Sequence, residues 1–257
     1  MSGLHGLVRH LLARNTAPEL DPAAVERHER AFYRRYVQPG MTVFDVGANI
    51  GELTLLFRNA VGRSGSVHAF EANAETYSTL AAAVKNAACA NVAVNCVAVT
   101  DMVGRVPLYV YAPEYASWTT LARRPLSRYG IEIDPPRVEE TDTVTVDHYC
   151  NTRGIREIDL LKVDVEGAEY QVLRGAEQML RLQAVRCCVF EFGQTTFDMG
   201  NRPADIERYL ADCGYDVTNL VGGMPIFPGG SSAATARFAM HVCRPRTGGG
   251  RRSASER

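Results

Sequence analysis

A short segment of the chain combines a carboxylate, two glycines and an asparagine in a pattern suited to ligand binding. The sequence VFDVGANIG places Asp45 at the end of an apolar run, and Gly47, Asn49 and Gly51 follow at alternate positions. Glycines permit a tight turn and a close approach of the backbone to a ligand. The pattern differs from the GxGxxG turn that holds a pyrophosphate, and a carboxylate precedes it. It suits a positively charged ligand such as S-adenosylmethionine.

Other carboxylates also close apolar runs. Glu71 follows the run HAF and lies 20 residues after Gly51, the spacing at which α/β nucleotide-binding folds place a carboxylate on ribose hydroxyls. Asp164 and Glu166 lie in LLKVDVEGAE, and Glu191 lies between aromatic residues in VFEF. Acids at strand ends are also common near helix N-termini, so each of them alone is weak support for a site.

Apolar runs and helical patterns alternate along the chain, which predicts the elements that position these acids. We expect strands at 42–46, 67–70, 92–99, 158–163, 185–192 and 238–243, and helices at 52–61, 74–87, 168–180 and 203–213. This alternation predicts an α/β fold with a mostly parallel sheet and helices on both faces. The carboxyl ends of parallel strands meet at one edge, so the acids should gather there.

The remaining segments define the expected domain organisation. Residues 1–40 should form a helical segment packed on the core, with an amphipathic helix near residues 4–12 and a second helix that begins after Asp21. Residues 41–246 should form the catalytic domain, with a surface insertion at about 104–146. The tail at 247–257 has no apolar content and is expected to be disordered.

Composition excludes several classes of protein. The 257 residues carry 28 Lys and Arg against 29 Asp and Glu, and a dedicated nucleic-acid binder would have a basic excess. Seven cysteines without a CxxC motif indicate reduced core residues rather than a disulfide framework. No apolar run is long enough to span a bilayer, and no signal peptide is recognisable, so we expect a cytoplasmic protein.

The motifs FDVGANIG, HAFEAN, LLKVDVEGAEYQVLRG and VFEF together resemble the FkbM-type S-adenosylmethionine-dependent methyltransferases, over about residues 25–221. The resemblance implies a class I methyltransferase fold, with a seven-stranded sheet whose last strand is antiparallel. It implies methyl transfer to a hydroxyl oxygen of a sugar or secondary metabolite, in the secondary-metabolism context of such enzymes. It places S-adenosylmethionine against Asp45, Gly47, Asn49, Gly51, Glu71 and Asp101.

The same resemblance places Asp164 and Glu166 next to the transferable methyl group. A hydroxyl nucleophile gains from a base that removes its proton, and we expect Asp164 or Glu191 in that role. His148 is a further candidate, although a surface or helix-capping position also explains it. Clustered acids could hold a divalent cation, but no metal-binding spacing is visible, so no metal is assigned.

Trp118 lies in the insertion, in the polar setting ASWTT. Its ring could form a platform for a small-molecule or glycan acceptor, or it could anchor the loop as a hydrophobic plug. Three alternatives to an O-methyltransferase remain open: an N- or C-methyltransferase, a nicotinamide-dependent oxidoreductase, and a cofactor-binding protein without activity. The sequence does not define the oligomeric state.

Overall fold

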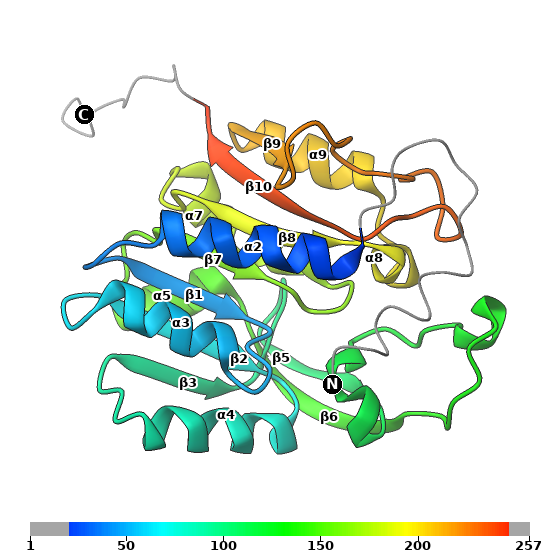
Figure 1. Ribbon diagram of the computed structural model, residues 1–257, viewed down its shortest axis with the longest axis horizontal. Coiled ribbons are helices and arrows are strands. Elements are labelled where there is room, and N and C mark those ends of the chain that lie inside the picture. Colours follow the sequence, from blue (N-terminus) through cyan, green and yellow to red (C-terminus); the bar gives the residue numbers. More distant parts are fainter. Residues whose placement is uncertain (1–20, 247–257) are drawn as a thin grey trace.

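Seven strands form the central sheet of the computed structural model, which describes residues 21–246 (Figure 1). The strands are β1 Thr42–Val46, β2 Ser66–Glu71, β3 Val92–Cys96, β7 Leu160–Val163, β8 Cys188–Phe192, β9 Tyr215–Asn219 and β10 Ala239–Pro245. Their order is β3-β2-β1-β7-β8-β10-β9. The first five of these are parallel, and β10 pairs antiparallel with β8 and β9. The expected class I methyltransferase sheet, with an antiparallel last strand, is confirmed.

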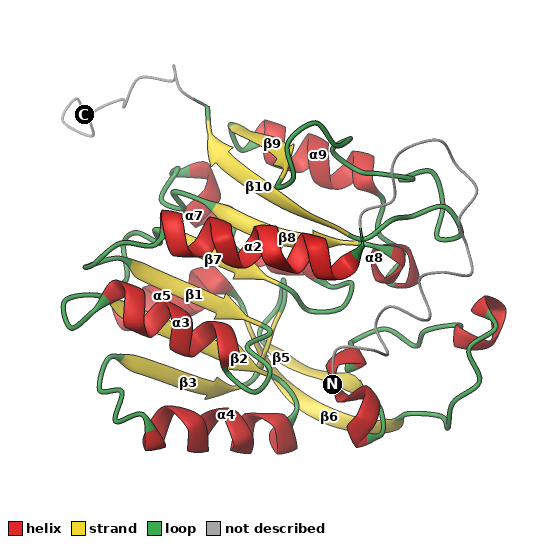
Figure 2. Ribbon diagram, viewed as in Figure 1, coloured by secondary structure: helices red, strands yellow, loops and turns green. Residues whose placement is uncertain are grey.

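Helices cover both faces of this sheet (Figure 2). They are α2 Pro22–Tyr36, α3 Glu52–Val61, α4 Ala74–Asn86, α5 Val146–Arg153, α6 Glu169–Gly175, α7 Glu177–Arg181, α8 Gln194–Asp198 and α9 Pro203–Asp212. Figure 1 shows α2 and α3 in front of the sheet and α5 behind it. The start of α2 follows from its sequence, because the Asp21 side chain accepts a hydrogen bond from the Ala23 amide and Pro22 follows it.

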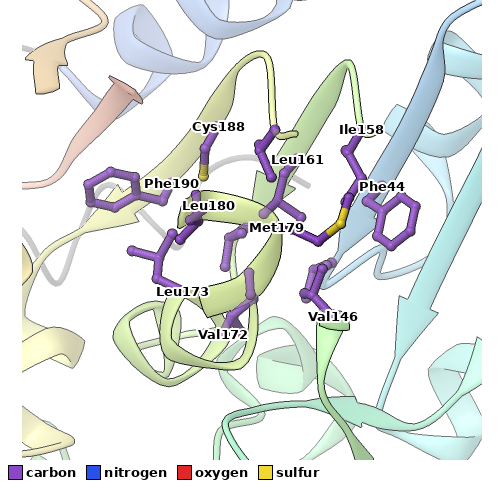
Figure 3. Close-up of a cluster of buried hydrophobic side chains, with 14 of the residues drawn as sticks. Phe44, Val146, Ile158, Leu161, Val172, Leu173, Met179, Leu180, Cys188 and Phe190 are labelled. Atoms are coloured by element: carbon purple, nitrogen blue, oxygen red, sulfur yellow. The ribbon is translucent and has the colours of Figure 1, made fainter. Parts of the chain in front are cut away.

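The alternation of side chains along each strand divides the core in two. Val43 of β1 packs with Phe57 of α3 and Tyr33 of α2 on one face. Phe44, the next residue, packs on the opposite face with a larger cluster that includes side chains of α5, α6, α7 and α9. Figure 3 shows part of this second cluster, in which Leu161 and Phe190 of the sheet face helical residues such as Leu173. The central strands β1, β7 and β8 are therefore buried on both faces, as their continuous apolar runs predict.

The chain between β3 and α5 forms a second, three-stranded sheet. Its strands are β4 Ala98–Val99, β5 Gly104–Val110 and β6 Arg137–Val144, in the order β4-β6-β5. Between β5 and β6 lie two short 3₁₀ helices, η2 Pro113–Trp118 and η3 Leu126–Tyr129. In Figure 1 this segment extends beyond the carboxyl ends of β1 and β2.

Some elements differ from their expected bounds. The strand expected at 92–99 is divided into β3 and β4, which belong to different sheets. The helix expected at 168–180 is interrupted at Ala176, which ends α6 and begins α7. Strand β9 and helix α8 were not expected, because β9 is a half-exposed edge strand without a long apolar run and α8 has only five residues.

Other expectations concern the whole chain. No helix within residues 21–246 is long and apolar enough to cross a membrane. All seven cysteines are free, and five of them are buried. The expected helix near residues 4–12 and the expected disordered tail at 247–257 lie outside the described residues.

Candidate functional site

A cavity of about 590 Å³ lies where β1, β2, β7 and β8 end. Residues after these strands line it, as expected for a parallel α/β sheet. Two further walls come from outside the sheet: helix α2 contributes one, and Ala116, Ser117 and residues 119–121 of the insertion contribute the other. Several walls that converge on one polar hollow are typical of a small-molecule site.

The glycine turn after β1 is held closely against the loop after β7. Gly47 and Gly51 have positive φ values of 77° and 93°, and Asn49, at φ 50°, also lies in the left-handed region. A Cβ atom added to Gly47 would lie 1.8 Å from the backbone oxygen of Asp164, and one added to Gly51 would lie 2.7 Å from Leu80 Cδ1. Packing against the backbone of Asp164 therefore requires glycine at position 47, whereas at position 51 the left-handed φ favours glycine. Gly47 and Asn49 line the cavity.

Asp45 lies behind this turn rather than in the cavity wall. Its side chain is fully buried, and it is not among the lining residues. Its Oδ2 accepts a hydrogen bond from Thr54 Oγ1 at 2.6 Å, and its Oδ1 is 3.2 Å from Lys162 Nζ. Through these contacts Asp45 positions the glycine turn from the side that faces away from the cavity.

Lys162 joins the turn to the acidic loop. Its ammonium donates to the carbonyl of Gly47 at 2.7 Å and lies 3.8 Å from Asp164 Oδ2. Burial lowers its pKa, but the charges of Asp45 and Asp164 outweigh that effect, and the net shift is upward. Lys162 is therefore a permanent cation between two carboxylates, and a poor proton acceptor.

Glu71 faces the cavity at the end of β2. One carboxylate oxygen accepts from the Asn49 amide at 3.0 Å and the other from the Asn73 amide at 2.9 Å. Burial raises the pKa of Glu71, although the two amide bonds oppose that shift. These bonds fix the carboxylate beside the glycine turn, in the place expected for a ribose-binding group.

Three acids from β7 and β8 lie together on the cavity wall: Asp164, Glu166 and Glu191. Burial raises the pKa of Glu191 well above its ordinary value, and the charges of Asp164 and Glu166 and a hydrogen bond with Asp164 raise it further. The hydrogen bond and the neighbouring charges therefore couple the titration of Glu191 to that of Asp164, as is usual for two carboxyl groups in one site.

The backbone of the acidic loop is strained and braced. Glu166 has a left-handed φ of 54°, which costs a residue with a Cβ about 1–2 kcal/mol. The buried Glu169 compensates, because its Oε1 accepts from the Val165 amide at 3.0 Å and the Gly167 amide at 3.1 Å. Thr120 of the insertion donates to the carbonyl of Glu166 at 2.7 Å. A conformation held by so many bonds marks a position where orientation matters.

The charge of the cavity fits S-adenosylmethionine. Seven lining side chains are Asp or Glu, and two are Lys or Arg. Both of these cations have carboxylate partners, since Lys162 pairs with Asp45 and Arg30 pairs with Glu52 at 2.5 Å. A cofactor with a sulfonium and an ammonium group would offset part of this negative charge.

Five expected residues are not among those that line the cavity: Asp45 and Gly51, described above, and Asp101, His148 and Trp118. Asp101 pairs with Arg174 at 3.3 Å. His148 is exposed on the first turn of α5, where its amide donates to the capping Thr145 side chain at 3.0 Å. Trp118 is buried in a cluster with Tyr111 and Leu126. The contacts of Trp118 are those of a hydrophobic plug that anchors the insertion. His148 lies at an exposed position near the start of a helix.

Sequence patterns did not single out several residues that shape the site. Glu29 of α2 lines the cavity, but it lies within a helix of mixed polarity far from any glycine turn. Thr54 and Glu169 are buried polar residues whose partners are defined only by the fold. Thr119 lines the cavity, and its Oγ1 has no hydrogen-bond partner in the part of the chain that the structure describes.

Within residues 21–246 no group of three or more His, Cys, Asp or Glu side chains is arranged to hold a metal ion.

Comparisons with known proteins found a family model and related methyltransferases. The family model described as "Methyltransferase FkbM domain" matches residues 45–217. Methyltransferase sdnD of Sordaria araneosa is 31% identical over 199 residues, which cover 68% of this chain and 74% of that protein. The 31-O-demethyl-FK506 methyltransferase FkbM of Streptomyces tacrolimicus is 34% identical over 171 residues, 58% of this chain and 65% of that protein.

A crystal structure of methyltransferase FkbM from Methylobacillus flagellatus is also similar. The TM-score is 0.48 with 13% sequence identity, and the match covers 83% of this chain and 50% of the other chain.

Proposed function

Because the chain belongs to the FkbM methyltransferase family and is an S-adenosylmethionine-dependent methyltransferase, we propose that it methylates a hydroxyl oxygen on a sugar or a secondary metabolite. The relative from Streptomyces tacrolimicus is named for a 31-O-demethyl compound. By analogy, this name supports an oxygen acceptor. The acceptor would be a small molecule or glycan that enters the cavity between the acidic loop and the insertion.

The paired carboxyls of Asp164 and Glu191 are the observation that carries this proposal. A hydroxyl must lose a proton as it attacks, whereas a neutral amine can attack without a base. Burial and the neighbouring carboxylates raise the pKa of Glu191, which favours its protonated form and makes it the donor in its hydrogen bond with Asp164. Asp164 is thereby held in one orientation at the cavity wall, with Lys162 3.8 Å away to favour its ionised form.

S-adenosylmethionine supplies an electrophilic methyl group. In the proposed transfer the acceptor oxygen would bond to the methyl carbon, and the bond from that carbon to sulfur would break with its electron pair left on sulfur. Asp164 would take the hydroxyl proton, and no other reactant is needed. The protein must hold the acceptor oxygen in line with the breaking bond, at roughly 3 Å from the methyl carbon.

Other residues would hold the cofactor and the acceptor. We assign Gly47, Asn49 and Glu71 to the cofactor, with Asp45 and Gly51 positioning the turn. Glu166 would lie beside the transferred methyl group. On the acceptor side the insertion contributes Ser117, Thr119 and Leu121 to the wall, and the Thr119 hydroxyl offers a hydrogen bond to the acceptor.

The acceptor can be found by incubating the protein with carbon-13 methyl-labelled cofactor and a metabolite extract of the source cell. Mass spectrometry would identify the labelled product, and the carbon-13 chemical shift of the methyl group would report whether it is attached to oxygen, nitrogen or carbon. Attachment to oxygen is expected, and attachment to nitrogen or carbon would contradict the proposal.

With the acceptor known, Asp164→Asn should lower kcat by at least about 100-fold, because the variant removes the base. Glu191→Gln should lower kcat less, since the Gln amide still donates to Asp164. Asp212→Asn, an exposed carboxylate at the end of α9, is the matched control. Steady-state kinetics of the three variants would test the assignment, and near-normal turnover in both cavity variants would rule out an oxygen acceptor that needs a base.

A further inference from the structure

Helix α2 places a buried carboxyl group in the cavity from outside the matched family segment. Glu29 is 7% exposed and lines the cavity, whereas the family match begins only at Asp45. The Tyr33 hydroxyl, one helical turn later, donates to Glu29 Oε1 at 2.8 Å. This bond holds the carboxyl in one orientation, which distinguishes Glu29 from an exposed acid on a helix surface.

Several charged groups lie around Glu29. Asp164, Lys162 and Asp45 act on it electrostatically, and Glu26, Arg30 and Glu52 line the same cavity. The two cations are engaged elsewhere: Lys162 with Asp45 and the Gly47 carbonyl, and Arg30 with Glu52. Glu29 therefore faces a cavity with an excess of carboxylates.

This environment disfavours an ionised Glu29 in the free protein. Burial raises its pKa to about 7, and the charge of Asp164 adds to the effect, while Lys162 and the Tyr33 bond oppose it. A ligand that brings a cation to this wall would stabilise the carboxylate and displace its proton.

The position of Glu29 along the cavity indicates which cation it would meet. The charges that act on Glu29 are those of Asp164, Lys162 and Asp45, and the ribose-side carboxylate Glu71 is not among them. Arg30, which follows Glu29 in α2, pairs with Glu52 at the start of α3. The methionine part of the cofactor ends in an α-ammonium group, and it extends away from the ribose.

We propose that Glu29 is the counter-ion of the α-ammonium group of bound S-adenosylmethionine. Helix α2 then completes a cofactor site that residues 45–217 leave open. The inference depends on the cofactor and is independent of the acceptor.

The cofactor product S-adenosylhomocysteine and its analogue 5′-methylthioadenosine separate this contact from the others. S-adenosylhomocysteine has the α-ammonium group but no sulfonium, and 5′-methylthioadenosine has neither. For the wild-type protein, calorimetric titration should show the Kd of S-adenosylhomocysteine falling roughly tenfold between about pH 5.5 and about pH 7.5, as Glu29 becomes able to ionise. In Glu29→Gln the Kd at the upper pH should be weaker, and its change with pH should be smaller. The Kd of 5′-methylthioadenosine should be the same in both proteins at each pH, which also shows that the variant is folded.

Tyr33→Phe tests whether Glu29 acts through its charge, because a purely structural role of Glu29 would leave the pH dependence of binding unchanged. The variant removes a hydrogen bond that lowers the pKa of Glu29, so the midpoint of the pH dependence should shift to higher pH while the limiting affinity is largely kept.

Three results would overturn the proposal: unchanged affinity and pH dependence in Glu29→Gln, an equal effect of that variant on 5′-methylthioadenosine, or tighter wild-type binding at low pH. The last result would mean that protonated Glu29 donates to the α-carboxylate instead. If neither analogue bound the wild-type protein, the cofactor site itself would be wrong, which is a separate failure.

Discussion

Lys162 shows how one buried residue can hold together two parts of a site. It lies on β7, yet its ammonium reaches the Gly47 carbonyl after β1, and it pairs with Asp45 at 3.2 Å. Its side chain is 3% exposed and that of Asp45 is 0% exposed. A pair so deeply buried contributes little net stability when complete, but breaking it leaves one charge without compensation.

Lys162→Met should therefore lower the free energy of unfolding by about 3–5 kcal/mol, because Asp45 would remain buried without its partner. Urea denaturation would measure the loss. The double variant Asp45→Asn/Lys162→Met should lose less than Lys162→Met alone, since neither charge remains. A double variant that is less stable than both single variants would contradict this account.

The sequence allowed us to foresee most of the acids on the cavity wall but not all of their roles. Asp164, Glu166, Glu191 and Glu71 could be found because each follows an apolar run that had to be a strand. Asp45 could also be found at the end of an apolar run. Its pairing with Lys162 could not, because that depends on the register of β1 with β7. The sequence predicts that Gly47 allows a ligand to approach the backbone closely. In the structure it is the backbone of Asp164 that lies close to Gly47.

At the scale of elements, the insertion is tied to the acidic loop and to α8. Arg124 pairs with Asp198 at 3.1 Å and reaches Glu166 at 3.9 Å, and the Tyr129 hydroxyl also donates to Asp198. The side chains of Arg124 and Asp198 are 8% and 2% exposed. This buried network positions residues 116–121, most of which line one wall of the cavity.

Asp198→Asn should loosen this wall, because Arg124 and Tyr129 would lose their ionised partner. Amide hydrogen exchange in residues 113–130 should become faster, and the KM for the acceptor should rise, while the Kd of S-adenosylmethionine changes by less than about threefold. Asp142→Asn is the control, since its pair with Arg105 is exposed and should contribute little. Unchanged exchange in Asp198→Asn would exclude the network as the anchor of the insertion.

The elements that sequence reasoning placed well are those with an unambiguous pattern. Strand β1 and helix α3 match their expected bounds, because an apolar run and an amphipathic period are bounded by glycines. The division of 92–99 into β3 and β4 could not be foreseen, since both halves are apolar and only the three-dimensional course of the insertion separates them. Strand β9 has only one fully buried residue, Tyr215, and therefore no clear apolar pattern.

At the scale of the whole molecule, acids with raised pKa values and histidines with lowered ones have opposite effects on stability. The buried Glu29 and Glu169 have their pKa values raised to about 7 by burial, from an ordinary value of 4.5. Burial lowers the pKa values of His68 and His241 to about 4, from 6.5. Between pH 4.5 and 6.5 the folded state binds more protons at the acids and fewer at the histidines than the unfolded state does, so the two effects oppose each other.

Above about pH 6.5 only the buried acids still make the free energy of unfolding depend on pH. In the folded state they keep protons that they have already lost in the unfolded state. The free energy of unfolding should therefore fall as the pH rises from about 6.5 to about 8. Chemical denaturation at several pH values would show this decline. Glu29→Gln should make it shallower, because Gln does not titrate, whereas exposed Glu207→Gln should not change it. A flat or rising wild-type curve over this range would contradict the assignment.

The close contact between Gly47 and the Asp164 carbonyl also has a kinetic consequence. The loop that would carry the cofactor and the loop that would carry the base touch without an intervening side chain, and Lys162 bridges them, so parting them would break these contacts. We expect the exits for spent cofactor and methylated product to lie where the walls come from separate elements, along α2 and along the insertion. The turnover number would then be sensitive to residues of those two segments that never approach the reacting atoms.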